Sequence, residues 1–493
     1  MSAFTHVAFT EVASRIREGE RPDDHGARTM RMRGRGSNAS LLAVLACASM
    51  FATVATSSAG AQEGPPVRQL PRAIATTTDP LLSTSQVRAL PGGRLLLNDA
   101  TRRRLVLFDS TLAKFTVVAD SAVGFPNPYG TAVSTLLPYR GDSSLLMDPT
   151  SLSMLVIDPE GRIVRVRAIP RSQDATRIAN LYSGVDADGR LLYRGINPLM
   201  LPSVPPGGGV AVPDQPDSIA VLRIDLATRK LDTAALVKTP KSTMTVTQSP
   251  SGGIRINQRT NPMPTLDEWA VTSDGRLALV RGRDYHVDWL NRDGTITSSP
   301  KMPFDWQRLD EDGKAKFLDS VKVAREKQRE TSMKMMQTRY DSLMEVSRKT
   351  GGPAPEPMPP VQDMYPPINM VGPDEIPDYK PPFGASAVRA DADGNLWIRT
   401  NPMKPTPGGP VYDIVNGEGV LIDRVQFPIT RTLVGFGPGG IIYVGTRGPR
   451  GVMLEKVPLH GPPPEPADPS RPPPGGVPAP RPAIPTQPPP PPR

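Results

Sequence analysis

The sequence is poor in the residues that most often carry chemistry. Its 493 residues include one cysteine, four histidines and only 5% aromatic residues. Cys47 lies in the N-terminal leader, so cleavage of that leader would exclude disulfides, thiolate zinc sites and cysteine nucleophiles together. Only His286 and His460 follow the leader, and they are far apart in the sequence. No G-x-S-x-G, H-E-x-x-H or P-loop motif is present, so no catalytic residue is predicted.

The chain also lacks a long apolar run after its leader. Near the N-terminus a basic stretch precedes the apolar run Leu41 to Ala55, and the small-x-small pattern Ala59-Gly60-Ala61 follows, as in a signal peptide. The run is shorter than the roughly 20 residues of a membrane span. We therefore expect export to the periplasm or the cell exterior, with no membrane span in the mature chain. Lipoprotein anchoring through Cys47 is not favoured, because too short an apolar core precedes it.

A concentrated charge of one sign is absent as well. The formal net charge is +9, with 58 Lys and Arg mixed among 49 Asp and Glu. A nucleic-acid groove gathers its basic residues and places aromatics among them, so no nucleic-acid partner is expected. Prolines, by contrast, are abundant, 60 in all, and they crowd the tail 460–493. That composition favours disorder or polyproline II, and the tail could serve as a spacer, in envelope association or as a ligand of a proline-recognising module.

A unit built around a turn glycine recurs along the chain. "GRLLLNDATRRRLVLFD" begins at Gly93 and "GRLALVRGRDYHVDWLN" begins at Gly275, with the same length. "DSSLLMDPTSLSMLVID" begins at Asp142, and further copies open at Gly189, Gly394 and Gly440. Where no insertion intervenes, the copies start about 46 to 49 residues apart, a period typical of propeller blades.

Each unit is expected to contain four short strands, except the sixth, which has only three clear ones. An apolar strand leads to an Asp-Gly or similar turn, and the next strands are apolar nearly throughout, as expected when neighbours cover both faces of a sheet. Six copies predict an all-β, six-bladed β-propeller with blades near 84–120, 130–170, 180–238, 265–301, 383–428 and 431–459. "VRQLPRAIAT", residues 67–76, is predicted to pair into the sixth blade and close the ring.

These boundaries give a domain plan for the whole chain. The order is leader and signal peptide 1–61, N-terminal segment with a ring-closing strand 62–83, blades one to four 84–301, helical and proline-rich insertion 302–382, blades five and six 383–459, and proline-rich tail 460–493.

The first copy resembles the NHL repeat, with Asp99 and Arg104 after Gly93 and the close Phe108-Asp109. The second copy departs from it at Ser153, so the resemblance is to the wider class that includes NHL-like, TolB-like and gluconolactonase-like propellers and exported bacterial propellers. It covers residues 67–459 apart from the insertions. Asp99 and Arg104 flank a hairpin turn, and we expect a surface ion pair within the blade, worth under about 1 kcal/mol, rather than a catalytic pair.

The resemblance also raises the question of whether the channel binds a metal ion. Gluconolactonase-like propellers hold a divalent cation in the channel with Glu, Asn and Asp, and that pattern cannot be matched here residue by residue. Glu268 is a weak candidate. The acidic pairs Asp186-Ala187-Asp188 and Asp391-Ala392-Asp393 precede turn glycines, and we interpret them as turn residues rather than calcium ligands. No metal and no cofactor is predicted.

The insertion 302–382 contains strong helix formers and no proline over 310–349, which predicts one long or two broken helices. A methionine stripe that includes Met333 and Met336 is interpreted as a buried helix face, with a partner-binding surface as the alternative. In the proline-rich return that follows, Tyr365, Tyr379 and Phe383 are expected to anchor an extended segment, which could also cover the channel.

One arrangement suggests a ligand site. Arg88 and Arg389 each lie five residues before a turn glycine, on the innermost strands of blades one and five. Their guanidinium groups could face one side of the central funnel and bind a carboxylate or phosphate, or each could pair with an acid of the neighbouring blade. The favoured function is an exported, non-enzymatic binding or scaffolding propeller with an unidentified ligand or protein partner. The alternative is a metal-dependent lactonase or hydrolase with its site in the channel.

Overall fold

The computed structural model describes residues 64–84, 86–132, 134–179, 183–196, 214–241, 243–248, 254–352, 369–401, 408–448 and 451–461. The leader with Cys47, Tyr365 and the tail beyond Gly461 lie outside these ranges. Within them, no helix is long and apolar enough to cross a membrane.

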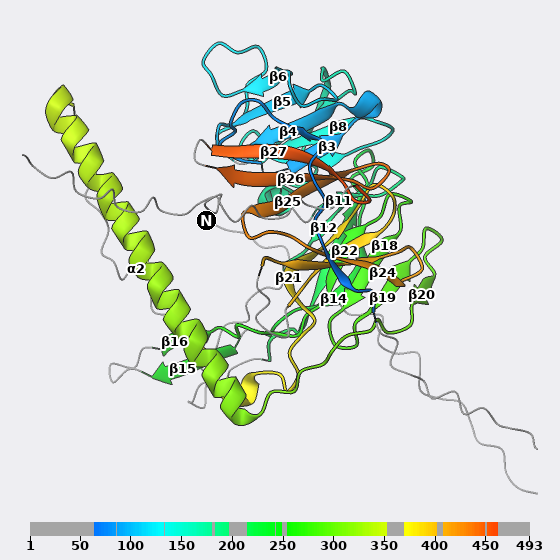
Figure 1. The fold of residues 1–493 in the computed structure, drawn as a ribbon, viewed down its shortest axis with the longest axis vertical. Coiled ribbons are helices and arrows are strands. Elements are labelled where there is room, and N and C mark those ends of the chain that lie inside the picture. The colour runs from blue at the N-terminus through cyan, green and yellow to red at the C-terminus, as the bar shows by residue number, and fades with distance from the viewer. Residues whose placement is uncertain are drawn as a thin grey trace, which may run out of the picture. The chain divides into compact units, whose positions relative to one another are not determined.

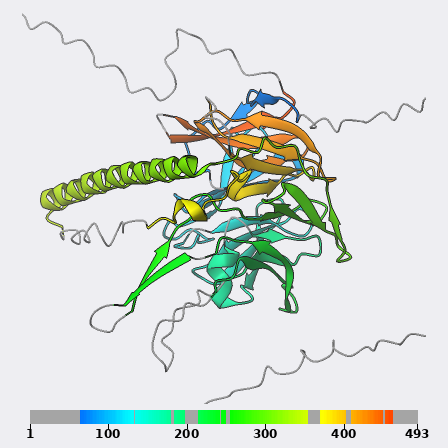
Figure 2. The ribbon, with the colours of Figure 1, turned by 90° about the horizontal axis from the view of Figure 1, so that it is seen from below.

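The chain folds into a six-bladed β-propeller (Figures 1 and 2). Blades one to four are four-stranded antiparallel sheets whose strands follow sequence order. Their strands are β3 (Gln86–Ala89), β4 (Leu95–Asp99), β5 (Arg104–Phe108) and β6 (Phe115–Asp120); β7 (Thr135–Pro138), β8 (Ser144–Asp148), β9 (Ser153–Ile157) and β10 (Ile163–Ala168); β11 (Gly184–Val185), β12 (Leu191–Arg194), β13 (Ser218–Ile224) and β14 (Leu231–Lys238); and β17 (Glu268–Val271), β18 (Leu277–Arg281), β19 (His286–Leu290) and β20 (Ile296–Ser298).

Blades five and six complete the ring with help from the N-terminal segment. Their own strands are β21 (Phe383–Ala390), β22 (Leu396–Thr400), β23 (Val411–Val415) and β24 (Leu421–Gln426), then β25 (Arg431–Gly437), β26 (Ile441–Gly448) and β27 (Gly451–Pro458). The first strands of neighbouring blades contact each other, among them β3 with β7 and β25 with β3. The ring therefore joins the last blade to the first.

The N-terminal segment forms two strands in two blades. β1 (Val67–Gln69) pairs parallel with β24 of blade five, whereas β2 (Ala75–Thr76) pairs antiparallel with β27 as the fourth strand of blade six. We expected one strand in blade six only; Pro71 lies between the two strands and lacks the N–H that a continuous ladder needs. Arg68 holds both blades, because its Nε donates to Asp423 at 2.9 Å and its Nη1 donates to the carbonyl of Leu459 at 2.9 Å.

Blade packing explains why the strands are so apolar. All five residues of β4 and of β8 are buried, so both faces of each sheet are covered by neighbouring blades, as the sequence pattern predicted. Asp99, at the end of β4, lies directly opposite Arg104 and 3.8 Å from it. The carboxylate is fully buried and accepts hydrogen bonds from the backbone and hydroxyl of Ser83. Our expectation of a surface ion pair is wrong, because the segment before β3 covers the turn.

The hairpin turns use the acidic pairs as the sequence suggested. Asp186 accepts hydrogen bonds from the backbone N–H groups two and four residues later, at 3.1 and 2.9 Å, and Asp391 does the same at 2.9 and 2.8 Å. The turn glycines Gly189 and Gly394 have φ values of 75° and 89°. Side chains with a Cβ rarely adopt this conformation, so glycine is required at both positions.

Two additions lie outside the blades. The hairpin of β15 (Thr243–Gln248) and β16 (Ile254–Arg259) follows blade three and was not anticipated, because it does not belong to the repeat. The insertion after blade four forms one helix, α2 (Glu311–Thr350), as the sequence predicted (Figure 1). Asp310 caps its first turn by accepting a hydrogen bond from the Gly313 N–H at 2.8 Å.

Only the first turns of α2 are buried by described residues. Lys314 and Leu318 are the buried side chains, and Leu318 packs against Met263, Val371 and Ile376. Further along the helix, the stripe residues Met333, Met336 and Tyr340 are half-buried, and Leu343 is 49% exposed. None of them is fully buried by the described residues, so the predicted buried helix face is not formed with that part of the chain. Of the expected aromatic anchors of the return, Phe383 lies in the core and Tyr379 is half-exposed.

Candidate ligand-binding cavity

The first strands of all six blades enclose a cavity of about 740 Å³. This volume lies within the range of roughly 300 to 1,000 Å³ that is usual for small-molecule sites. The wall combines apolar side chains with four arginines, Arg88, Arg140, Arg389 and Arg399. A propeller axis that is open to this extent can hold a ligand.

Strand register defines one layer of the cavity wall. In each blade, one residue of the first strand lies directly opposite the residue eight positions later on the second strand. All six of these residues line the cavity. In blade order they are Arg88, Leu137, Gly184, Ala270, Arg389 and Gly435. Three of the six have little or no side chain, which keeps the axis open beside the two arginines.

Arg389 ties its blade to the next one. Its Nη1 donates to the carbonyl of Leu433 at 3.1 Å and its Nη2 donates to the carbonyl of Val434 at 2.7 Å, both on β25. The guanidinium also lies 5.3 Å from the ring centre of Phe436. The predicted contact with the neighbouring blade is thus made with backbone carbonyls of β25.

Arg88 occupies the same layer but has different contacts. Its Nε is buried without a hydrogen-bond partner, and it forms no ion pair with any residue the structure describes. Burial lowers the pKa of Arg88, an effect that the nearby Asp142 carboxylate in blade two partly offsets. Both predicted arginines therefore line one cavity. Arg389 donates hydrogen bonds to blade six, whereas Arg88 has N–H groups that no described residue accepts.

Sequence reasoning missed several polar residues of the wall, among them Arg399 and Tyr412. These two belong to β22 and β23, the second and third strands of blade five, rather than to an innermost strand. The alternation of side chains along "LWIRT" could have shown that Arg399 shares a face with Trp397.

Glu268, the weak metal candidate, is engaged elsewhere. Its Oε2 accepts a hydrogen bond from Arg194 Nη2 at 3.0 Å, and its Oε1 accepts one from the Ser386 N–H at 2.9 Å. Burial raises the pKa of Glu268, and the Arg194 charge opposes that rise. Ser386 itself has a φ of 63° within a bulge of β21, so the carboxylate holds a strained backbone. No group of three His, Cys, Asp or Glu side chains suited to a metal occurs in the described part of the chain.

His286, one of the two histidines that follow the leader, lies on the third strand of blade four. His286 Nε2 is 3.2 Å from Asp288, whose other carboxylate oxygen accepts from Arg281 Nε at 2.7 Å. His286 is not among the residues that line the cavity. Its contact with Asp288 belongs to a hydrogen-bonded network within the sheet.

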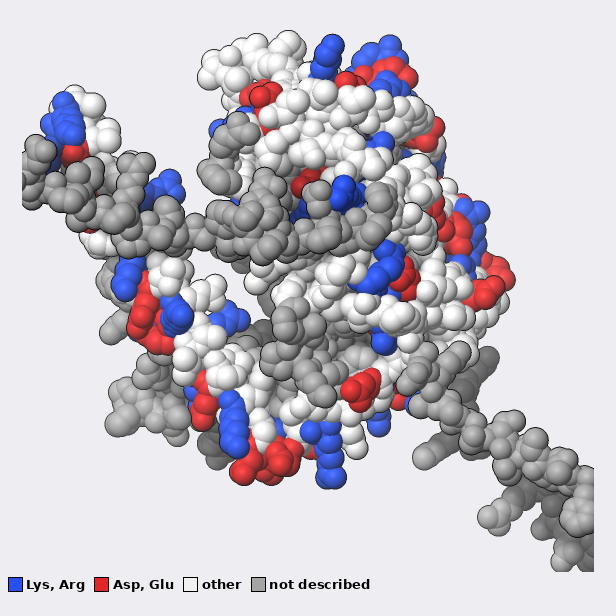
Figure 3. All heavy atoms as spheres, in the orientation of Figure 1, with Lys and Arg blue, Asp and Glu red and all other residues white. Residues whose placement is uncertain are grey.

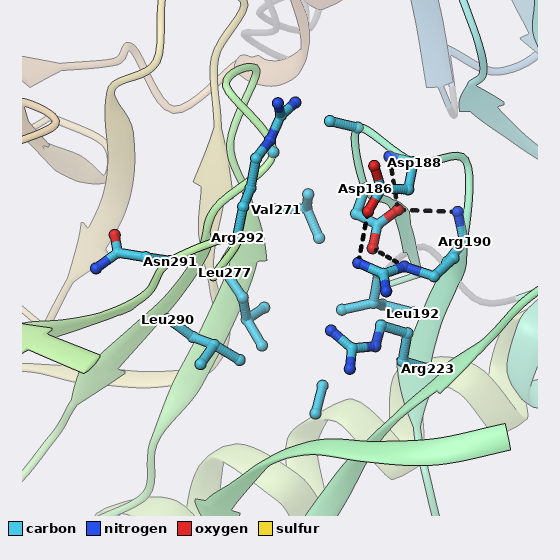
Figure 4. A pocket seen from close by; sticks show the side chains of 13 residues that line it. Asp186, Asp188, Arg190, Leu192, Arg223, Val271, Leu277, Leu290, Asn291 and Arg292 are labelled. Carbon is cyan, nitrogen blue, oxygen red and sulfur yellow. Dashed lines mark hydrogen bonds and ion pairs between the residues drawn. The ribbon is translucent and has the colours of Figure 1, made fainter. Parts of the chain in front are cut away.

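A second, much smaller pocket lies between blades three and four (Figure 4). Arg190 lies between Asp186 and Asp188, 2.8 Å from each, and Arg223 is 2.8 Å from Asp232. The pocket holds about 20 Å³, enough for little more than one water molecule. The ion pairs of Arg190 and Arg223 and this small volume argue against a ligand site here.

The surface shows no large area of one charge on the face drawn in Figure 3. Lys and Arg side chains are interspersed with Asp and Glu there, and the same mixture follows α2. The positive net charge is thus spread over many sites on this face.

The fold defines a six-bladed β-propeller with an axial cavity, consistent with the NHL-like and TolB-like class. No protein-family model and no curated protein matches the sequence. Solved propellers resemble the structure at about 10% identity. A member of the duf4221 family from Bacteroides vulgatus matches 78% of this chain and 97% of its own, with a TM-score of 0.38.

Two further matches have similar coverage. A putative exported protein from Bacteroides fragilis has 10% identity and a TM-score of 0.35, over 78% of this chain and 84% of its own. A gluconolactonase from Xanthomonas campestris has 10% identity and a TM-score of 0.32, over 80% of this chain and 99% of its own. Identities and scores this low do not bear on what this chain binds or catalyses.

Proposed function

We propose that this chain is an exported, non-enzymatic binding propeller whose axial cavity holds an acidic small molecule, with Arg88 as the anchor. The observation that carries the proposal is the Arg88 guanidinium, which lines the cavity and has no ion-pair partner among the described residues. The proposal of export depends on the leader sequence alone. Arg389, although part of the same wall, serves the fold through its bonds to β25.

The physical argument concerns the cost of burying a charge. A partly buried guanidinium without a counter-ion loses hydration and gains little in return, so an arriving carboxylate or phosphate would supply the missing ion pair. Such groups match the planar donors of arginine and form strong, charge-assisted hydrogen bonds. The small residues Gly184, Ala270 and Gly435 leave space beside this donor for the rest of the ligand.

The lactonase alternative has less support. Glu268, the candidate ligand from the sequence, is paired with Arg194 and with the backbone of Ser386, and it does not line the cavity. A ligand-binding role needs no further catalytic group, whereas a hydrolase would need a nucleophile or an activated water. We therefore propose binding rather than hydrolysis.

The test is to titrate the purified protein with acetate, succinate and inorganic phosphate. Calorimetry measures the binding, and the melting temperature is measured with and without each anion. We expect at least one anion to bind and to raise the melting temperature, because a ligand of the folded state stabilises it. Arg88→Met should weaken that binding at least tenfold. Arg165→Met, on the exposed outer strand β10, is the matched control and should leave binding unchanged. Binding that is equally strong in the Arg88 variant, or no binding by any of these anions, would overturn the proposal.

A further inference from the structure

A second cationic cluster lies on the cavity wall between blades five and six. Arg399, Tyr412 and Thr432 all line the cavity, and they come from β22, β23 and β25. The cluster is separate from Arg88, which lies on blade one. None of its polar groups belongs to the site proposed at Arg88.

Strand pairing places the members of blade five on one face. Arg389 lies directly opposite Trp397, and Arg399 lies directly opposite Tyr412. Directly opposed residues share a face of the sheet, and so do residues two apart on one strand, such as Trp397 and Arg399. The Trp397 ring is 5.3 Å from that of Phe436 in blade six, so this is the face toward blade six.

Tyr412 is buried and has an unused donor. Its side chain packs at 4.9 Å from Phe427 and 6.0 Å from Trp397, measured between ring centres, and the residue is only 8% exposed. Its hydroxyl makes no hydrogen bond to any described residue. Burial raises the pKa of Tyr412, whereas the charges of Arg399 and Arg389 lower it. The phenol therefore stays protonated and can donate to a ligand.

Arg399 completes the cluster with an unpaired charge. It forms no ion pair or hydrogen bond within the described ranges. The acids of the cavity wall are Asp186 and Asp391, which lie at hairpin turns, where backbone N–H groups bind them. Arg399 is two residues beyond the layer of Arg88 and Arg389, about 7 Å along the strand and away from those turns.

We infer that the cavity takes an elongated ligand with two acidic groups, one at Arg88 and the other at Arg399 and Tyr412. This inference depends on the proposed function, since it assigns a second anchor to the same cavity. Arg399 supplies the charge, and the hydroxyls of Tyr412 and Thr432 supply neutral donors. Either a carboxylate or a phosphate can satisfy such a set of donors. The anchors come from different blades and lie about two residues, roughly 7 Å, apart along the strand direction, a spacing that suits two acidic groups joined by a chain.

The experiment compares linear dicarboxylates of about four to ten carbons with monocarboxylates of the same length by calorimetry. We expect one chain length to bind best, at least tenfold tighter than its monocarboxylate. Arg399→Met should remove this preference, and Tyr412→Phe should reduce it while leaving the melting temperature within about a degree of the wild type. A parallel series with phosphonate at one end tells carboxylate from phosphate recognition.

The outcomes separate the two proposals. If Arg399→Met and Tyr412→Phe keep the preference for the dicarboxylate while Arg88→Met abolishes binding, the second anchor is wrong and the first stands. If Arg399→Met abolishes binding while Arg88→Met has no effect, the anchor proposed for the function is wrong. A wild-type protein that binds mono- and dicarboxylates equally well overturns the two-group ligand. Arg165→Met should match the wild type throughout.

Discussion

Tyr285 of blade four donates a hydrogen bond of 2.6 Å to the carboxylate of Asp413 in blade five. Both side chains are buried, and Arg424 lies 3.2 Å from the other oxygen of Asp413. Burial raises the pKa of Asp413, and its two partners oppose that rise. The bond therefore joins two blades at a point where a lost donor cannot be replaced by water.

Removing this donor should destabilise the ring. We expect Tyr285→Phe to lower the free energy of unfolding by about 1–3 kcal/mol, because a buried acceptor loses a hydrogen bond. Tyr379→Phe is the matched control, since Tyr379 is half-exposed and its hydroxyl is not part of a buried network. Denaturant unfolding measures both. A Tyr285 variant as stable as the control would show that the bond contributes nothing.

Glu268 should contribute a distinct pH dependence. Burial raises its pKa in the folded protein, so the folded state keeps this proton to a higher pH than the unfolded chain, whose glutamates titrate near about 4.3. Its contribution to stability is then complete below that value and is lost as the pH rises through the folded pKa. The free energy of unfolding of the wild type, relative to Glu268→Gln, should fall as the pH rises above about 4.3. A difference that grows with pH over the same range would contradict the direction of the shift.

The two arginines of the cavity layer should differ in their effect on stability. Without ligand, Arg389→Met should lower the free energy of unfolding by about 1–3 kcal/mol, since two bonds to backbone carbonyls are lost. Arg88→Met should leave it unchanged or raise it, because an unpaired guanidinium gives way to an apolar side chain. Urea unfolding of both variants provides the comparison. Equal losses in the two would mean that Arg88 has a structural partner as well.

The N-terminal segment should be essential to the closed ring. Leu70 is 1% exposed and packs in the cluster shared by blades five and six, whereas Val67 on the same segment is 48% exposed. We expect Leu70→Ala to cost about 2–5 kcal/mol, as large-to-small core changes do. Val67→Ala should cost less than about 1 kcal/mol. Thermal melts of the two variants check this, and similar melting temperatures would show that the segment packs loosely.

The repeat and the helix could be predicted because their causes are local. Turn glycines such as Gly189 and Gly394 need a positive φ, and strands such as β4 are apolar on both faces; each of these signals lies within a few residues. The helix α2 was likewise predicted from helix formers without proline. The β15–β16 hairpin was missed because it follows no repeat. The methionine stripe is only half-buried by the described residues, because helical spacing does not show what packs against a helix face.

The candidate site depended more on tertiary structure. Counting from the turn glycine placed Arg88 and Arg389 on the innermost strands. The strand pairing shows that both lie opposite the residue eight positions later, so they occupy the same position in their blades. The sequence could not show that Arg389 would bind β25, nor that Arg399 and Tyr412 would line the same cavity. These relationships depend on how neighbouring blades pack, and the pattern within one repeat does not show that packing.

The sequence by itself determined the blade, because turn chemistry, strand length and apolar faces act over short distances. Only the tertiary structure decided where the ring closes, with β1 on blade five and β2 on blade six. It also decided which arginine remains unpaired. A guanidinium binds the acceptors that neighbouring blades place near it. For Arg389 the acceptors include carbonyls of β25, whereas no described residue pairs with Arg88.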